Sequence, residues 1–167
     1  MERWEISSED EDYPNELLLL NHPPEIIYGM GDRSVLQQPC MSVIGARRAT
    51  PYGMAIAEMA GRCAADNNIV VVSGGALGCD YRAGMASLNA GGKTVVVAGC
   101  GADVTYPTTS AELFEVAREG RGAVISLDRW GMPPRRYAFP RRNAVIAALG
   151  KVLLVTEAGL CSGTMST

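Results

Sequence analysis

The sequence alternates short, continuously apolar stretches with helix-like stretches, and most of the apolar stretches end in glycine-rich turns. Strands buried on both faces have this continuous apolar composition, whereas strands with one solvent face alternate. The order strand, helix, strand predicts an α/β fold with a doubly wound, mainly parallel sheet. The strands that we expect cover residues 40–44, 69–72, 94–98, 122–127 and 152–155. The helices expected between them cover residues 51–67, 80–89, 110–118 and 141–149.

Two regions differ in pattern. Residues 1–38 form an N-terminal segment interrupted by prolines, in which residues 17–20 are long enough for a short helix. The strand and helix alternation occupies residues 39–167. The sequence stops at Thr167, where a glycine-rich turn should open another helix. We therefore expect the sheet domain to be incomplete, with an apparent truncation at its C-terminal side.

Composition limits the function classes. No apolar run approaches the roughly 20 residues that a membrane-spanning helix needs, and the first residues lack the features of a signal peptide. The five cysteines are odd in number and form no CxxC pair, so we expect neither a disulfide framework nor a zinc site. A cytoplasmic protein without metal or cofactor fits this composition best.

Glycine-rich turns follow four of the expected strands. They are Gly45-Ala46-Arg47, residues 73–78, Gly99-Cys100-Gly101 and the turn at Ser162-Gly163-Thr164. In an open parallel sheet, ligands bind outside the carboxyl ends of the strands. Small residues there allow close approach, and free N–H groups at helix starts attract anions. The turns therefore predict a phosphate-binding edge.

Positive charge is concentrated beside these turns. The net charge is −3, but no acid occurs between Arg129 and Lys151, a stretch that holds six basic residues. It includes Phe139-Pro140-Arg141-Arg142-Asn143, which we place at the start of a helix. Cations oppose the dipole of a helix N-terminus, which favours an anionic ligand there. Phe139 is either a core residue, which we favour, or a stacking surface for a base.

Other chemistries are weakly supported. The dinucleotide fingerprint GxGxxG is absent, and Lys93 precedes a strand, whereas a P-loop lysine follows one. His22 is the only histidine and lies beside two prolines, so a Ser-His-Asp or Cys-His centre is not indicated. Asp80 is more suited to anchoring its turn than to acting as a general base.

The ordered set of motifs resembles the DprA/Smf family of DNA-processing proteins over nearly the whole chain. The motifs that carry the resemblance are Tyr13-Pro14, Pro23-Pro24, Gly45-Ala46-Arg47, Ser73-Gly74-Gly75, Tyr106-Pro107, Phe139-Pro140-Arg141-Arg142-Asn143 and Ser162-Gly163-Thr164. The resemblance implies a Rossmann-like domain that binds single-stranded DNA. It also implies a protein without enzymatic activity that protects DNA during natural transformation and recombination, helps to load the recombinase RecA, and can form a homodimer.

Carried over by position, the resemblance implies a set of DNA-binding residues. They are Arg47, Ser73, Gly74, Gly75, Arg141, Arg142, Asn143, Ser162 and Gly163. Four positions depart from the usual pattern. Leu77 stands where an arginine is usual, Gly84 where a histidine is usual, Leu127 where a glutamate is usual, and Ala144 where an arginine is usual.

Two other interpretations stay open from the residues. One is a nucleotide phosphoribohydrolase of the related lysine-decarboxylase-like group, to whose first glycine motif residues 75–85 are faintly similar. The second motif of that group, PGGxGTxxE, is not met by residues 158–164. The other is a degenerate relative that binds a mononucleotide or nothing.

Overall fold

The computed structural model describes residues 2–159, 164 and 167. In this part of the chain, seven strands form one sheet in the order β1-β2-β6-β5-β4-β3-β7. The strands are β1 (Arg3–Ser7), β2 (Ile26–Gly31), β3 (Cys40–Ile44), β4 (Val70–Ser73), β5 (Thr94–Ala98), β6 (Gly122–Ser126) and β7 (Val152–Val155). Strands β3 to β7 run parallel, and β1 and β2 extend the sheet antiparallel at one side. The predicted doubly wound, mainly parallel α/β sheet is confirmed.

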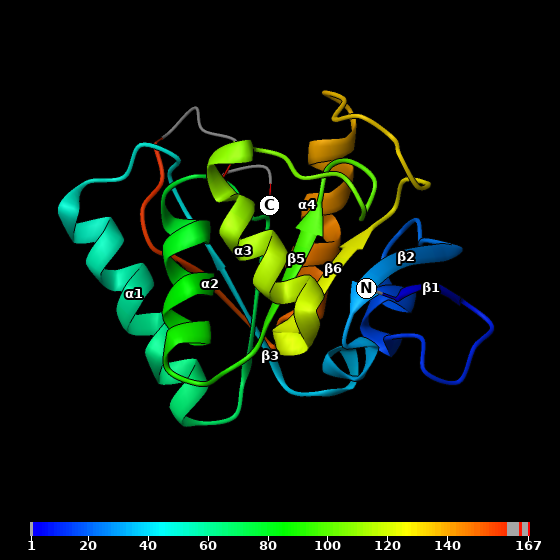
Figure 1. Cartoon of the computed structure of the whole chain (residues 1–167), viewed down its shortest axis with the longest axis horizontal. Helices are drawn as coiled ribbons and strands as arrows, with labels where there is room; N and C mark the ends of the chain where they lie inside the picture. The colour runs from blue at the N-terminus through cyan, green and yellow to red at the C-terminus, as the bar shows by residue number, and fades with distance from the viewer. Residues whose placement is uncertain (1, 160–163, 165–166) are drawn as a thin grey trace.

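The helices connect the parallel strands on both faces of the sheet. They are α1 (Pro51–Asp66), α2 (Cys79–Asn89), α3 (Ala111–Val116) and α4 (Ala138–Leu149), with the short turns η1 (Asn15–Leu19), η2 (Arg33–Gln37), η3 (Thr108–Ser110) and η4 (Ala117–Arg121). Figure 1 shows α1, α2 and α3 on one face and α4 on the other. From β3 the chain winds outward to β6, and α4 then crosses the opposite face to bring β7 beside β3. The winding direction therefore reverses between β3 and β7.

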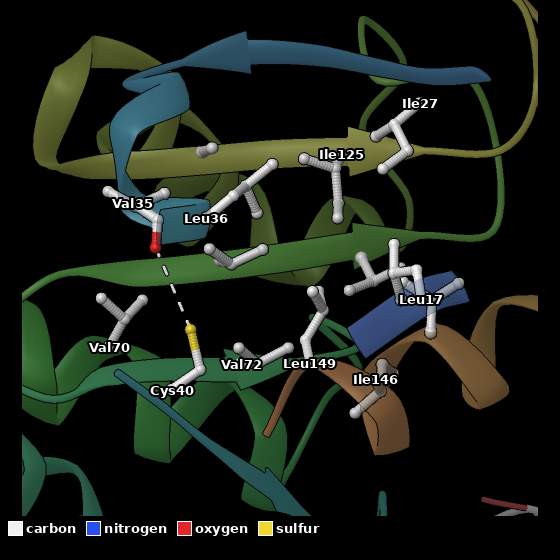
Figure 2. Packing of buried hydrophobic residues seen from close by; sticks show 14 of the residues in the cluster. Leu17, Ile27, Val35, Leu36, Cys40, Val70, Val72, Ile125, Ile146 and Leu149 are labelled. Carbon is white, nitrogen blue, oxygen red and sulfur yellow. Dashed lines mark hydrogen bonds between the residues drawn. The ribbon is translucent and has the colours of Figure 1, made fainter. Parts of the chain in front are cut away.

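Buried side chains separate into the two faces as the strand period requires. Val70 and Val72 of β4 face α4, whereas Val71 packs with α1 and α2. Figure 2 shows the α4 side, where Leu17 of η1, Leu36 of η2 and Ile146 of α4 converge on the sheet. The N-terminal segment thus completes the hydrophobic layer over α4's face of the sheet.

Several predicted elements need correction. The sequence analysis missed β1 and β2, which place residues 3–31 in the same sheet as the rest. Helix α4 begins at Ala138, three residues before the predicted start, so Arg141 and Arg142 lie in its second turn. Ser110 is the N-cap of α3, but its side chain makes no cap hydrogen bond, and its buried Oγ has no partner among the described residues.

The edge strand β7 is the least covered strand of the sheet. Val152 is 60% exposed, Leu153 39% and Val155 45%. Immediately after β7, the Glu157 carboxylate accepts hydrogen bonds from the backbone N–H and the hydroxyl of Thr50, the N-cap of α1. This contact ties the end of β7 to the turn that follows β3, on the two sides of the winding reversal.

Candidate nucleic-acid interface

The carboxyl ends of β3 to β7 meet at one edge of the sheet, which we call the carboxyl edge. In open α/β sheets, the crevice where the winding reverses is the usual ligand site. Here the reversal lies between β3 and β7, so the turn carrying Arg47 borders it. Arg47 and Arg48 are both exposed in that turn.

The turn from Ser73 to Gly78 is held by its own polar groups. The buried Asp80 carboxylate accepts hydrogen bonds from the backbone N–H groups of Gly74, at 2.9 Å, and Ala76, at 3.4 Å. The Gly75 N–H donates to the Ser73 hydroxyl. Asp80 therefore anchors the turn, as expected, and these N–H groups are engaged within the fold. Burial raises the pKa of Asp80, while the charge of Arg142 and the backbone donors counteract that rise.

Arg142 reaches this turn from α4. Its side chain lies so close that a Cβ built on Gly74 would be 1.6 Å from Nη1 of Arg142, so only glycine leaves room for the guanidinium. The residue is 6% exposed, and its Nε and Nη1 atoms have no hydrogen-bond partner among the described residues. Burial lowers the pKa of Arg142. The negative charge of Asp80 opposes this decrease, whereas the positive charge of Arg47 lowers the pKa further. Arg47 and Arg142 are thus close enough to repel one another.

Arg141 does not share this position. Its guanidinium pairs with Asp128 at 2.5 Å, and it lines a groove between α4 and the N-terminal segment. Successive residues of a helix point about 100° apart, which separates the two side chains. Arg141 and Arg142, which the resemblance places in one set of DNA-binding residues, thus point to different surfaces, Arg142 to Gly74 and Arg141 to the groove.

Phe139 lies at the carboxyl edge and is only partly buried. It sits over Gly99, whose added Cβ would be 2.8 Å from the ring. The ring of Tyr106, which is 42% exposed, lies 6.0 Å away between centroids, and the Arg142 guanidinium carbon lies 5.9 Å from the Phe139 ring centroid. The favoured core role for Phe139 is wrong, because the ring lies beside the exposed Tyr106 ring and the buried Arg142 guanidinium and belongs to none of the buried hydrophobic clusters of the described residues.

The arginines divide into two groups by their partners. One group pairs with acids, as in Arg3–Asp103 and Arg141–Asp128, or donates to backbone carbonyls, as Arg118 does. Among the described residues, six arginines have no ion pair and no side-chain hydrogen bond, and all lie after β3 or between β6 and the second turn of α4. They are Arg47, Arg48, Arg129, Arg135, Arg136 and Arg142, and we call them the edge arginines.

The remaining predicted site residues are placed as follows. Ser73 and Asn143 are buried, and Gly75 adopts a positive φ of 64° in the turn. The side chains of Val96 and Phe114 occupy the space where a Cβ of residue 75 would lie. The glycine therefore allows the turn to pack against the core. Ser162 and Gly163 lie outside the described residues.

The four departures from the resembling family fall in different places. Leu77 is 46% exposed, in the turn at the carboxyl edge. Gly84 faces Leu113 inside the α2–α3 layer, away from that edge. Leu127 and Ala144 both line the groove beside Arg141. Only Leu77 thus removes a cation directly from the glycine turns.

Sequence reasoning also missed contributions to this edge. Tyr106 was recognised only as part of a family motif, since its nearness to Phe139 depends on the loop after β5 folding against α4. Arg135 and Arg136 were counted as local charge without a position. The acid-free run after Arg129 was the available signal for both.

The described residues are 2–159, 164 and 167. No helix there is long and apolar enough to cross a bilayer. No group of three or more histidine, cysteine, aspartate or glutamate side chains there is arranged to hold a metal ion.

Known proteins resemble the chain over almost its full length. The sequence profile of the family described as DNA recombination-mediator protein A matches residues 4–167. Protein Smf from Synechocystis sp. is 34% identical over 97% of this chain and 42% of its own length. DNA processing protein DprA from Streptococcus pneumoniae is 34% identical over 95% of this chain and 55% of its own length. The chain thus spans about half the length of these curated relatives.

Solved structures give the same result. The X-ray structure of DprA from Streptococcus pneumoniae superposes with a TM-score of 0.91 at 33% identity, over 97% of this chain and 56% of that one. DNA processing protein A from Helicobacter pylori, a protein with a single-stranded DNA binding mode, superposes with a TM-score of 0.87 at 32% identity, over 98% of this chain and 73% of that one. With its fold and its sequence motifs both matched by these proteins, the chain belongs to the DprA/Smf family of DNA-processing proteins, the DNA recombination-mediator protein A family.

Proposed function

We propose that this chain binds single-stranded DNA, without sequence preference, along its carboxyl edge. The observation that carries the proposal is the set of edge arginines, whose charges have no acidic partner in the described fold and which follow the carboxyl ends of β3 and β6 or lie near the start of α4. Phosphates are the natural partners of such unpaired arginines. A phosphate at Arg47 would also relieve its repulsion with Arg142.

The aromatic pair at the same edge favours single strands over duplex. Bases stack on exposed aromatic rings only when they are not already stacked in a duplex. Tyr106 and Phe139 lie close to one another, and Arg142 lies beside the Phe139 ring, so a base and its phosphate can be held together. The proposal assigns phosphate contacts to Arg47, Arg48 and Arg142, and base contacts to Tyr106 and Phe139.

The turn residues have a supporting part in this proposal. Ser73, Gly74 and Gly75 shape the turn, and Gly74 seats the Arg142 guanidinium. Asn143 is proposed to orient the start of α4, and Ser162 and Gly163 to border the strand from beyond β7. Arg141 is assigned to the neighbouring groove.

At the level of the whole protein, we propose a role in natural transformation and recombination. The protein would protect single strands in the cytoplasm and help to load a RecA-type recombinase, with no cofactor and no enzymatic step of its own. Homodimer formation belongs to the same proposal. Membership of the family and the single-stranded DNA binding mode of the Helicobacter pylori relative support it.

The phosphoribohydrolase alternative is less well supported. Hydrolysis needs an acid free to act as a general base, and the acids of the described residues nearest the edge are engaged in the fold. Asp80 anchors the glycine turn, Asp128 pairs with Arg141, and Glu157 accepts hydrogen bonds from Thr50, the N-cap of α1. Incubation with nucleoside monophosphates tests the alternative, since turnover to free base would favour it.

The test of DNA binding is a titration with labelled oligo-dT and a matched duplex at two salt concentrations. Each phosphate contact should add about −0.7 to the log-log salt slope for single strands. Arg62→Ala is the matched control, because Arg62 is an exposed arginine paired with Glu58 on α1. A flat salt response, or duplex binding as tight as oligo-dT binding, contradicts the proposal.

A further inference from the structure

A second concave surface lies next to the carboxyl edge, between α4 and the N-terminal segment. This groove has a volume of about 770 Å³, within the range of roughly 300–1,000 Å³ that ligand-binding clefts occupy. Apolar groups form much of its wall, among them Tyr28, Leu127, Ala144 and Val145. Tyr28 and Val145 are themselves almost fully buried, so this wall belongs to the rigid part of the fold.

Two arginines line the same groove. Arg141 is held in place by Asp128 while its side chain stays 47% exposed. Arg129 has no acidic partner among the described residues and is one of the edge arginines. The carboxylate of Glu25 also lines the groove. The groove therefore combines an apolar wall with cationic groups, of which Arg129 is uncompensated.

The groove is continuous with the proposed DNA site through the start of α4. Arg141 and Arg142 are neighbours in sequence, and they point to the groove and to Gly74 respectively. Arg135 and Arg136 lie on the exposed loop that joins Arg129 to α4. A strand leaving the Gly74 side would meet cations along this whole path.

Two residues make the wall of the groove apolar beside Arg141. Leu127 and Ala144 both line this groove. Neither side chain carries a polar group, so together they leave space and an apolar surface next to the cations.

We propose that this groove is a second subsite for the same single strand, which accepts a base against Leu127 and Ala144 while Arg129 and Arg141 bind the adjoining phosphate. This inference rests on the proposed function of the carboxyl edge. The apolar wall suits the face of a base, which every nucleotide presents, so the subsite is sequence-tolerant. Its contribution appears only with strands long enough to reach from Gly74 around α4.

The experiment compares the affinity for oligo-dT of about 4 and about 16 nucleotides, the span of usual site sizes in single-strand-binding domains. Ala144→Trp fills the groove from an exposed helical position. We expect it to leave the affinity for the short strand unchanged and to reduce that for the long strand by about tenfold, the effect of losing one base contact. Ala55→Trp, an exposed alanine on α1, is the matched control.

Arg129→Ala is the second variant, because it empties one cationic position without adding bulk. It should also weaken only the long strand and flatten its salt slope by about one contact. If both variants bind the long strand as tightly as the unmodified protein, the subsite proposal is wrong. That result also covers the case in which the groove binds a peptide instead of DNA. Failure of the proposed function is different, since the unmodified protein would then bind neither strand.

Discussion

The coupling between Arg142 and Asp80 offers the sharpest test of the site. The two charges attract one another through the interior at the glycine turn. The perturbations are Arg142→Met, which keeps much of the side-chain volume, Asp80→Asn, which keeps an acceptor for Gly74, and the two together. A double-mutant cycle isolates the pairwise interaction from the other effects of each change.

The structure bounds the magnitude of this coupling. Two charges 4 Å apart attract by about 4 kcal/mol at an effective dielectric constant of 20. Arg142 and Asp80 form no ion pair within that distance, so the coupling should be about 1–3 kcal/mol. Arg142→Met also removes two buried donors without partners, which cost about 1–3 kcal/mol each. The single variant should therefore lose less stability than the removal of a fully paired buried arginine.

The assay is urea unfolding at about pH 5 and about pH 8, with oligo-dT titration of the same variants. Burial raises the pKa of Asp80 in the fold. The stability that this group contributes is complete below its ordinary pKa and is lost as pH rises through the raised value. Without Arg142 that pKa rises further, so Arg142→Met should be more destabilising at the higher pH. Asp80→Asn removes this dependence.

Two results would refute this account. One is a coupling free energy below about 0.5 kcal/mol, which is the usual additivity of independent sites. The other is unchanged oligo-dT affinity in Arg142→Met, since charge-assisted hydrogen bonds of about 1.5–3 kcal/mol should be lost, which is roughly ten- to a hundredfold. Asp80→Asn should keep or increase that affinity, because it removes only negative charge.

Three further changes test individual contacts. Arg47→Ala should weaken binding of all sequences alike and flatten the salt slope by about 0.7, with a melting temperature near that of the unmodified protein, because Arg47 is exposed; a large loss of melting temperature with unchanged affinity would show a structural role. Gly74→Ala should displace the guanidinium of Arg142 and cost about 1–3 kcal/mol in urea unfolding, and this cost should disappear in an Arg142→Met background. Phe139→Ala should cost less than the ~3–5 kcal/mol of a fully buried ring and weaken oligo-dT binding; an intact affinity would remove Phe139 from the interface.

Much of the sheet could be predicted because its parallel strands are uniform apolar runs. Residues 94–98 and 152–155 were placed with their observed bounds, and 122–127 ended one residue late. The strands at the antiparallel side were missed for a physical reason. Residues 3–7 are mostly polar, and residues 26–31 contain two glycines, so neither has the composition of a buried strand. The pairing of β2 with β6, and of β1 with β2, comes from tertiary packing.

The candidate site was harder to predict from the sequence than the fold. The position of Arg47 follows from the end of β3, which the pattern located. The burial of Arg142 depends on Gly74, which lies far away in sequence and leaves the space for it. The start of α4 was misplaced because no side chain caps it. That error also concealed the divergence of Arg141 from Arg142, since helical phase decides which face each residue takes.

At the carboxyl edge, several glycines leave space for side chains of the protein itself rather than for a ligand. Gly74 receives Arg142, Gly99 receives Phe139, and Gly53 receives Glu157. Two of these three side chains come from α4, the helix that crosses to β7 on the opposite face. Had the chain continued winding on one face, the edge would offer mainly backbone N–H groups, and Asp80 already engages those of Gly74 and Ala76. The crossover instead brings an arginine and an aromatic ring to the strand ends, so the reversal of the sheet itself creates the surface that we propose binds DNA.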